Sequence, residues 1–358
     1  MIHLFRAAKV DIEFRDYPTN FVDYSRFDTT NFTRIRTYGL LTRPIKLIHC
    51  ASVHYQPRYR NSPSQRFLNA FFDAKESFNT TSVNAMLRLR NGSSSELQKS
   101  STEVLAVGLC IALARELFDI RLNRISVIET SGKRCDFTFE KADRRYVLES
   151  KGRESDSQIV PAIRDVFVKK SASPAPSKYG VVSHLPRDGT PISAIVVDPD
   201  DEEAIPTRED SISRLLGYYA KASRLAGFWR LAELLSVRST AIDQRRDLEG
   251  LERVALDYQN VFKVGKGYTL TSNNFSIEIF FPADKTLGFR QEIDDRIIFY
   301  SLDKSLVEIL EKQDFDALLQ YRPAIAITDI IETNLGMFSV NDDGTVFGFV
   351  SRELFESA

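Results

Sequence analysis

The chain has 358 residues, of which 43% are hydrophobic and 27% charged, and its formal net charge is −1. Such a composition is typical of a globular protein with two or three domains. Its three cysteines, Cys50, Cys110 and Cys135, lie far apart with no C-x-x-C pair. This spacing argues against a disulfide scaffold and against a zinc knuckle, and it favours a reducing compartment.

The distribution of charge and hydropathy along the chain indicates the compartment and the kind of partner to expect. No apolar run approaches the roughly 18 residues of a membrane-spanning helix, and Arg6, Lys9 and Asp11 interrupt the first apolar stretch. We therefore expect a cytoplasmic protein with no signal peptide and no membrane partner. Residues 1–100 carry 15 Lys and Arg against 8 Asp and Glu, whereas residues 201–358 carry 18 against 27. This asymmetry indicates either a basic face for nucleic acid beside an acidic scaffold, or charges scattered over a solvated surface.

Residues 1–95 are expected to form a basic, β-rich N-terminal region. Val10–Phe14 and residues 44–53 (PIKLIHCASV) have the apolar, β-branched composition of strands, and a helix is expected around residues 65–77. His49, Cys50 and His54 would complete a zinc site only with further ligands, so we interpret them as residues of a strand with an exposed histidine.

Basic and aromatic side chains are interleaved after this segment. Phosphate contacts and base stacking use this mixture, although a solvated loop has the same composition. The candidate nucleic-acid-binding residues are Arg58, Arg60, Arg66, Arg88 and Arg90.

Residues 96–200 have the pattern of one α/β layered unit. Ser101 and Thr102 resemble an N-cap for the buried helix of residues 103–118, and a second helix is expected at 155–171, with Pro161 delaying or kinking its start. The order is helix, three strands, helix and two strands. The expected strands are Ile125–Glu129, Arg134–Glu140, Tyr146–Lys151, Tyr179–His184 and Ser193–Asp198.

The remaining chain has two further patterns. Residues 201–260 are predicted to be helical, with helices at Asp210–Leu235 and Ile242–Gln259. Residues 261–358 are expected to form an acidic, mixed α/β region with a helix near 303–319, suited to a scaffold or a partner surface. Its strands are expected in FSIEIFF, RIIFY, AIAITDII and TVFGFV. The predicted fold class is therefore α/β, or α+β over the whole chain.

Two carboxylates and a lysine carry the strongest functional signal. Asp136 and Glu149 lie on strands joined by a hairpin, so they can be cross-strand neighbours, and Lys151 shares a strand face with Glu149. Mg²⁺ prefers such oxygen ligands and would polarise a phosphate, while a nearby lysine would stabilise developing charge. The alternative is a solvated ladder of charges on a surface hairpin.

This D-x12-E-x-K pattern, after a buried helix and before a second one, resembles the PD-(D/E)xK nuclease superfamily over residues 101–200. The resemblance implies a restriction-endonuclease-like αβββαβ core in which Asp136 and Glu149 bind metal and Lys151 is catalytic. It also implies an acidic first-helix ligand at Glu103, for which Glu116 and Glu129 compete, and a polar residue at Gln158. Cys135 stands where the family's motif has proline.

These features predict a Mg²⁺-dependent endonuclease, with Mn²⁺ able to replace Mg²⁺. Its expected substrate is nucleic acid, double-stranded DNA in particular, in restriction or anti-phage defence. A double-strand cut by single-site subunits would require a homodimer, and a partner protein of a defence system is another expectation. The alternative is an inactive nuclease-fold protein that binds nucleic acid or assembles subunits.

Overall fold

The computed structural model describes most of the chain and divides it into two compact units. The described residues are 2–16, 26–54, 71–72, 78, 85–90, 95–128, 135–142, 144–171, 177–198, 208–243, 266–272, 275–281, 290–293, 296–323, 330–333 and 336–352. Unit 1 comprises Met1–Arg60, Arg66–Arg121 and Ile125–Pro206. Unit 2 comprises Asn61–Gln65, Leu122–Arg124 and Thr207–Ala358.

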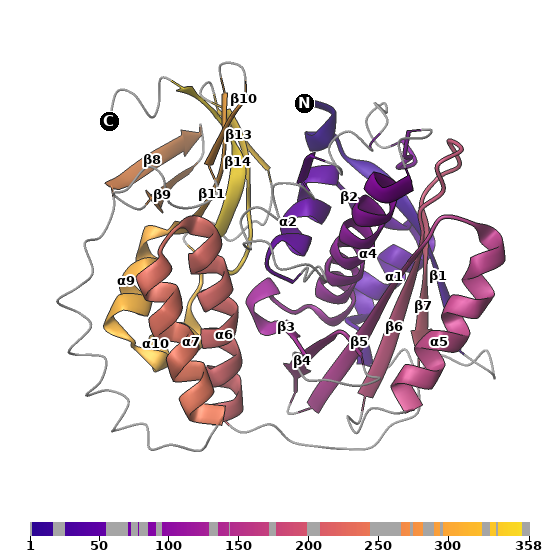
Figure 1. The fold of residues 1–358 in the computed structure, drawn as a ribbon, viewed down its shortest axis with the longest axis horizontal. Coiled ribbons are helices and arrows are strands. Elements are labelled where there is room, and N and C mark those ends of the chain that lie inside the picture. Colours follow the sequence, from indigo (N-terminus) through magenta and orange to yellow (C-terminus); the bar gives the residue numbers. More distant parts are fainter. Residues whose placement is uncertain are drawn as a thin grey trace. The chain divides into compact units, whose positions relative to one another are not determined.

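Unit 1 is built on one mixed sheet (Figure 1) with the strand order β2-β1-β7-β6-β5-β4-β3. Strands β3, β4 and β5 form an antiparallel meander, β6 pairs parallel to β5, β7 antiparallel to β6, and β1 parallel to β7. The strands are β1 (Ala8–Asp16), β2 (Leu40–Thr42), β3 (Ser126–Val127), β4 (Phe137–Lys141), β5 (Arg144–Arg153), β6 (Ser177–His184) and β7 (Ser193–Asp198).

Helices α4 (Ser95–Phe118) and α5 (Ile159–Ser171) cover opposite faces of this sheet. On β6, Tyr179 packs against Phe118 of α4, with ring centroids 5.0 Å apart. A Cβ added at the next residue, Gly180, would instead meet Val166 of α5 at 2.1 Å. Because successive strand residues point to opposite faces, the two helices enclose the sheet between them.

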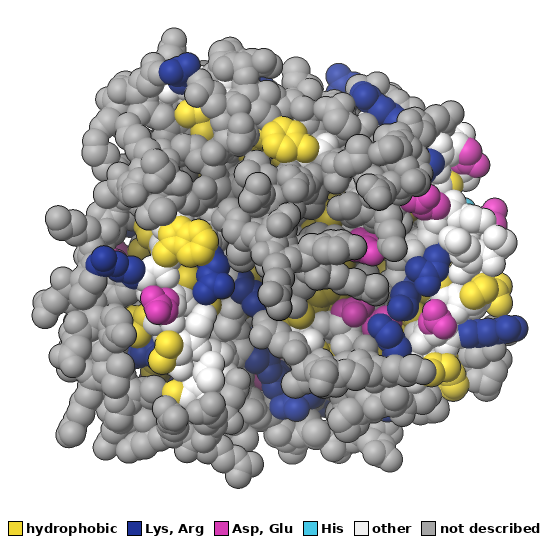
Figure 2. Space-filling view, viewed as in Figure 1, with side chains coloured by type: hydrophobic (Ala, Val, Ile, Leu, Met, Phe, Trp, Pro, Cys, Tyr) yellow, Lys and Arg dark blue, Asp and Glu magenta, His cyan; other side chains and the backbone are white. Residues whose placement is uncertain are grey.

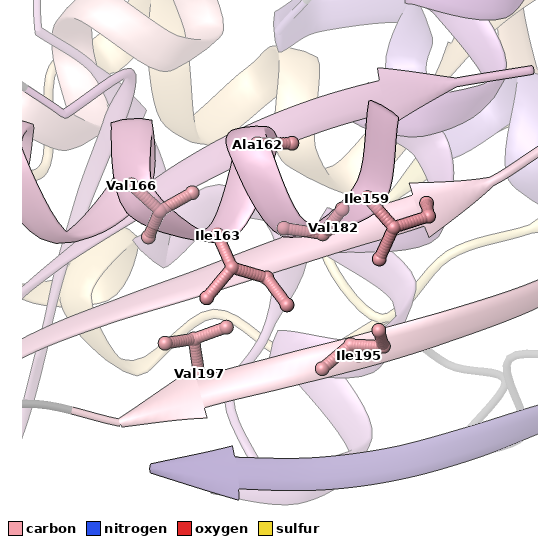
Figure 3. Packing of buried hydrophobic residues seen from close by; sticks show 7 residues of the cluster. All are labelled: Ile159, Ala162, Ile163, Val166, Val182, Ile195 and Val197. Carbon is pink, nitrogen blue, oxygen red and sulfur yellow. The ribbon is translucent and has the colours of Figure 1, made fainter. Parts of the chain in front are cut away.

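The α5 face is sealed by an apolar cluster (Figure 3). Its members are Ile159, Ala162, Ile163 and Val166 of α5 with Val182, Ile195 and Val197 of β6 and β7. The helical members recur at the three- and four-residue spacing of one helix face, which fixes the rotation of α5 over the strands. Pro161 lies in the first turn of α5, where a missing N–H costs no helical hydrogen bond.

The chain order α4, β3, β4, β5, α5, β6 is the order expected for residues 96–200. The prediction of a mixed α/β protein is confirmed. The strands predicted at Tyr179–His184 and Ser193–Asp198 are β6 and β7, the second with the predicted bounds.

The predicted strand at residues 44–53 is wrong, because this segment forms helix α2 (Pro44–His54). Its side chains are buried almost all round the helix, so neither a period of two nor of 3.6 was visible. His49 and His54 are buried rather than exposed, and His54 contacts the carbonyl oxygens of Cys50 and Ile125 at 3.0 and 2.8 Å. With α1 (Thr29–Tyr38), the described N-terminal region is more helical than β-rich.

The predicted N-cap at Ser101 and Thr102 is also wrong. Helix α4 begins at Ser95, so both residues lie in its interior and are buried. Their hydroxyls bond to side chains instead of free backbone N–H groups: Thr102 donates to Glu154 at 2.6 Å, and Arg187 donates to Ser101. Serine and threonine favour caps but are also tolerated inside a helix where tertiary partners exist.

Unit 2 contains a second sheet, antiparallel throughout its described pairs, with the order β12-β13-β14-β11-β9-β8 and β10 beside β11. Its strands are β8 (Lys266–Ser272), β9 (Phe275–Phe281), β10 (Arg290–Ile293), β11 (Arg296–Asp303), β12 (Ile330–Thr333), β13 (Gly336–Val340) and β14 (Thr345–Ser351). Its helices are α6 (Arg208–Ala226), α7 (Trp229–Asp243), α9 (Lys304–Lys312) and α10 (Phe315–Gln320).

Two predicted helices of unit 2 are each divided in two. The helix expected at Asp210–Leu235 is interrupted at Gly227, whose φ of 90° ends α6 before α7 begins. The helix expected near 303–319 is interrupted at Gln313, whose φ is 57°. Most of the helix predicted at 65–77, and Ile242–Gln259 beyond Asp243, lie outside the described residues, as does the first part of AIAITDII.

The four regions expected from the sequence combine into two units, with two regions forming most of each unit. Residues 1–95 and 96–200 share one sheet, since β1 pairs with β7, and the helical and acidic regions together form most of unit 2. None of the described helices is both long and apolar enough to cross a membrane.

Candidate active site

Glu149 and Lys151 lie side by side on β5 and point to the α5 face of the sheet. Gly152, between them and the end of the strand, faces the other way, because a Cβ there would meet Ala106 and Thr102 of α4 at about 3 Å. Lys151 Nζ is 3.0 Å from Glu149 Oε1. The Glu149 side chain is 0% exposed, so this carboxylate has lost its water and depends on protein partners.

Asp136 immediately precedes β4, and the hairpin register brings it beside Glu149. Phe137 pairs with Leu148, so one step outward places Asp136 opposite Glu149. The backbone N–H of Asp136 donates to the Leu148 carbonyl at 2.9 Å, and its Oδ2 accepts from the Ser150 N–H at 3.0 Å. The predicted convergence of the two carboxylates therefore has a structural basis in backbone pairing.

A second lysine, which the sequence analysis did not identify, lies between the carboxylates. Lys169 Nζ is 2.6 Å from Glu149 Oε1 and 4.0 Å from Asp136 Oδ1. Lys169 follows Val166 by three residues, so it continues the buried stripe of α5 toward the sheet. A lysine at an apolar-stripe position was the available sequence signal.

Burial and charge shift the ionisation of this cluster. Burial, followed by the charge of Asp136, raises the pKa of Glu149 from 4.5 to about 7, against the opposing effect of Lys151 and Lys169. Burial by itself lowers the pKa of Lys169, but its bond to Glu149 and the charges of both carboxylates raise that pKa above the ordinary value. Lys169 is thus held in its charged form against the pair.

The donor atoms of the cluster fit a hard divalent cation. Mg²⁺ is commonly held by one or two carboxylates and several waters, and Asp136 and Glu149 provide two. Oε2 of Glu149 is buried and has no hydrogen-bond partner among the described residues, so its lone pairs are not used by any donor there. Among the residues that the structure describes, no group of three or more His, Cys, Asp or Glu side chains is arranged to hold a metal ion.

Glu103 does not lie on the same side of the sheet as Asp136 and Glu149. It is exposed on α4, which covers the face of the sheet opposite to Glu149 and Lys151. Its expected role as third ligand is therefore not supported by the geometry. Gln158 is exposed at the end of the short turn Asp156–Gln158, and within the described residues no interaction links it to Asp136 or Glu149.

The expected nucleic-acid contacts are only partly described. Arg58, Arg60 and Arg66 lie outside the described residues. Arg88 is half-buried and donates to the carbonyl of Gly189, which is a structural bond, whereas Arg90 is exposed. On the face in Figure 2, described Lys and Arg side chains are interspersed with acidic ones.

Comparison of the chain with protein-family models, with curated proteins and with solved structures gave no match.

Proposed function

We propose that unit 1 is a metal-dependent nuclease that hydrolyses phosphodiester bonds of DNA, with Asp136 and Glu149 as the carboxylates that hold the metal. One observation carries the proposal: a fully buried glutamate with an unpartnered oxygen lies beside a second carboxylate and two lysines on one sheet face. Both lysines pair with Oε1 of Glu149, so Oε2 stays buried without a donor among the described residues, and an unsatisfied buried acceptor costs about 1–3 kcal/mol.

The bound cation would polarise the scissile phosphate and lower the pKa of an attacking water. Lys151 would hold that water or stabilise the charge developing on the phosphate, since its side chain is 18% exposed and its ammonium lies next to Glu149. The Ser150 N–H holds Asp136 Oδ2 and so fixes which carboxylate oxygen faces the site.

The alternative is a nuclease-fold protein that binds nucleic acid or a partner subunit without cutting. One observation favours it: Glu149 already pairs with Lys151 and Lys169, which is what a purely structural ion-pair cluster would show.

Cleavage of supercoiled plasmid DNA separates these functions. The full chain is incubated with Mg²⁺ or Mn²⁺, with EDTA in a parallel reaction, and the Asp136→Asn variant is treated identically. Metal-dependent nicking by the wild type and its loss in the variant are the expected results. DNA binding without nicking under every metal condition would favour the alternative.

A further inference from the structure

Lys169 occupies the position between the two carboxylates where a divalent cation would bind. Its Nζ contacts Glu149 Oε1 at 2.6 Å and lies 4.0 Å from Asp136 Oδ1, whereas the ion pair of Lys151 is with Glu149, at 3.0 Å. It reaches this position from α5, whose rotation is fixed by the apolar cluster of Figure 3.

When both carboxylates are ionised, the charges of the four groups balance. Asp136 and Glu149 then contribute two negative charges, and Lys151 and Lys169 contribute two positive charges. A divalent cation added to this set would give it a net charge of +2 in a partly buried site, where Coulomb repulsion is weakly screened. If the Lys169 ammonium moves out of the site, the net charge of the site falls to +1. The single negative charge of a substrate phosphate would then neutralise it.

Lys169 is also placed to leave. Its side chain is 27% exposed, so it borders solvent, and rotation about its four-carbon stem would move the ammonium without moving α5. Lys151 is less exposed, at 18%, and extends from the central part of the sheet.

We propose that Lys169 is a tethered cation that holds the metal position and must be displaced when a divalent cation binds. This inference rests on the proposed function, because it takes Asp136 and Glu149 as the metal-binding pair. Its consequence is that the wild-type site binds free metal weakly and fills chiefly when a polyanion is present to receive the displaced charge.

The test measures Mn²⁺ binding to the full-length protein without nucleic acid, from the electron paramagnetic resonance signal of free Mn²⁺. Lys169→Gln removes the charge. Arg164→Gln removes the same charge from an exposed position on the same helix and is the matched control. Lys169→Arg keeps the charge, and Asp136→Asn removes a proposed ligand. Circular dichroism spectra establish which variants are folded.

Lys169→Gln should bind Mn²⁺ about tenfold or more tightly than the wild type, while Arg164→Gln and Lys169→Arg should stay within about twofold of it. Unchanged affinity in folded Lys169→Gln, together with lost binding in Asp136→Asn, would overturn the displacement of Lys169 and leave the metal site standing. Binding that Asp136→Asn does not weaken, or no binding in any variant, would overturn the proposed metal site itself. An equal gain in Lys169→Gln and Arg164→Gln would reduce the effect to general electrostatics and so overturn the displacement.

Discussion

Glu149 and Lys169 form an ion pair between a strand and a helix, with Lys169 Nζ 2.6 Å from Glu149 Oε1. Twenty residues separate them, and the connection between β5 and β6 runs over one face of the sheet through α5. The crossover helix therefore returns a charged side chain to the strand that precedes it. This pair makes the candidate site a four-group cluster instead of a D/E/K triplet.

Asp136→Asn should reduce cleavage of plasmid DNA by at least about 100-fold, because it removes a charge from the metal-binding pair. The fold should persist, since the Asp136 side chain is 39% exposed and an amide oxygen can still accept from the Ser150 N–H. Asp165→Asn is the control and should cut normally, because the Asp165 side chain is 63% exposed on α5 and its ion pair with Arg153 is long, at 3.9 Å. Near-normal cleavage by Asp136→Asn would show that the site is wrongly assigned.

Lys151→Met should lower the cleavage rate by about 100-fold or more through lost stabilisation of the transition state. DNA affinity and Mn²⁺ binding should not be lost, because the substitution leaves the two proposed metal ligands, Asp136 and Glu149, in place. Single-turnover kinetics and fluorescence anisotropy separate the two quantities. Lys178→Met removes the same charge from β6 and serves as the comparison. Retained cleavage with lost DNA affinity would make Lys151 a phosphate clamp.

Reversing Arg58 and Arg60 to Glu tests the basic N-terminal region. If these residues contact phosphates, DNA binding should weaken and its salt dependence should flatten, by about 0.9 in the log–log slope for each lost contact. Arg296 and Lys312 of unit 2 form a suitable control pair. Lys304 is unsuitable, because it pairs with Glu278 at 2.8 Å. Equal losses from the two double reversals would remove any special role of the N-terminal region.

Gly108→Ala tests the packing of α2 against α4. A Cβ at Gly108 would lie 2.2 Å from the Leu47 carbonyl oxygen, so the helices would have to separate, at a cost of about 1–3 kcal/mol or more. Gly217→Ala in α6 would meet only Ser239 Oγ at 3.4 Å and should be neutral or stabilising by up to about 1 kcal/mol. Urea unfolding measures both. Unchanged stability of Gly108→Ala would contradict the close packing of α2 against α4 at Leu47.

Asp343 should make unit 2 less stable as the pH rises. Burial, followed by the charge of Asp342, raises the pKa of Asp343 from 3.8 to about 6, although Tyr218 and Thr345 donate hydrogen bonds to its carboxylate. The pKa of Asp343 is higher in the folded state than in the unfolded state, so protonation of Asp343 stabilises the folded state. This stabilisation is complete below about pH 4 and is lost as the pH rises through 6. The loss amounts to about 3 kcal/mol. Urea unfolding at pH 4 to 8 should show this slope in the wild type and less of it in Asp343→Asn; parallel profiles would disprove it.

Local sequence determined the short apolar strands and the amphipathic helix of unit 1. Residues 193–198 form a short run rich in β-branched residues, which is typical of a strand buried on both faces. Residues 159–171 carry the apolar spacing of a helix with one buried face. The spacing of Glu149 and Lys151 likewise determined that both side chains share a strand face. The predicted opposition of Asp136 and Glu149 needed only a hairpin with the right register.

Three features of unit 1 depend on tertiary packing and could not be predicted from the local sequence pattern. Residues 44–54 form a helix in which nearly every side chain is buried, and this burial removes the periodicity that would have identified the helix. Glu103 is separated from the carboxylates because α4 covers the opposite face of the sheet, and sequence spacing does not specify on which face a helix packs. Lys169 reaches Glu149 and Asp136 because the α5 crossover packs on the face to which they point, so the charge balance of the site depends on a contact between a helix and the strand preceding it.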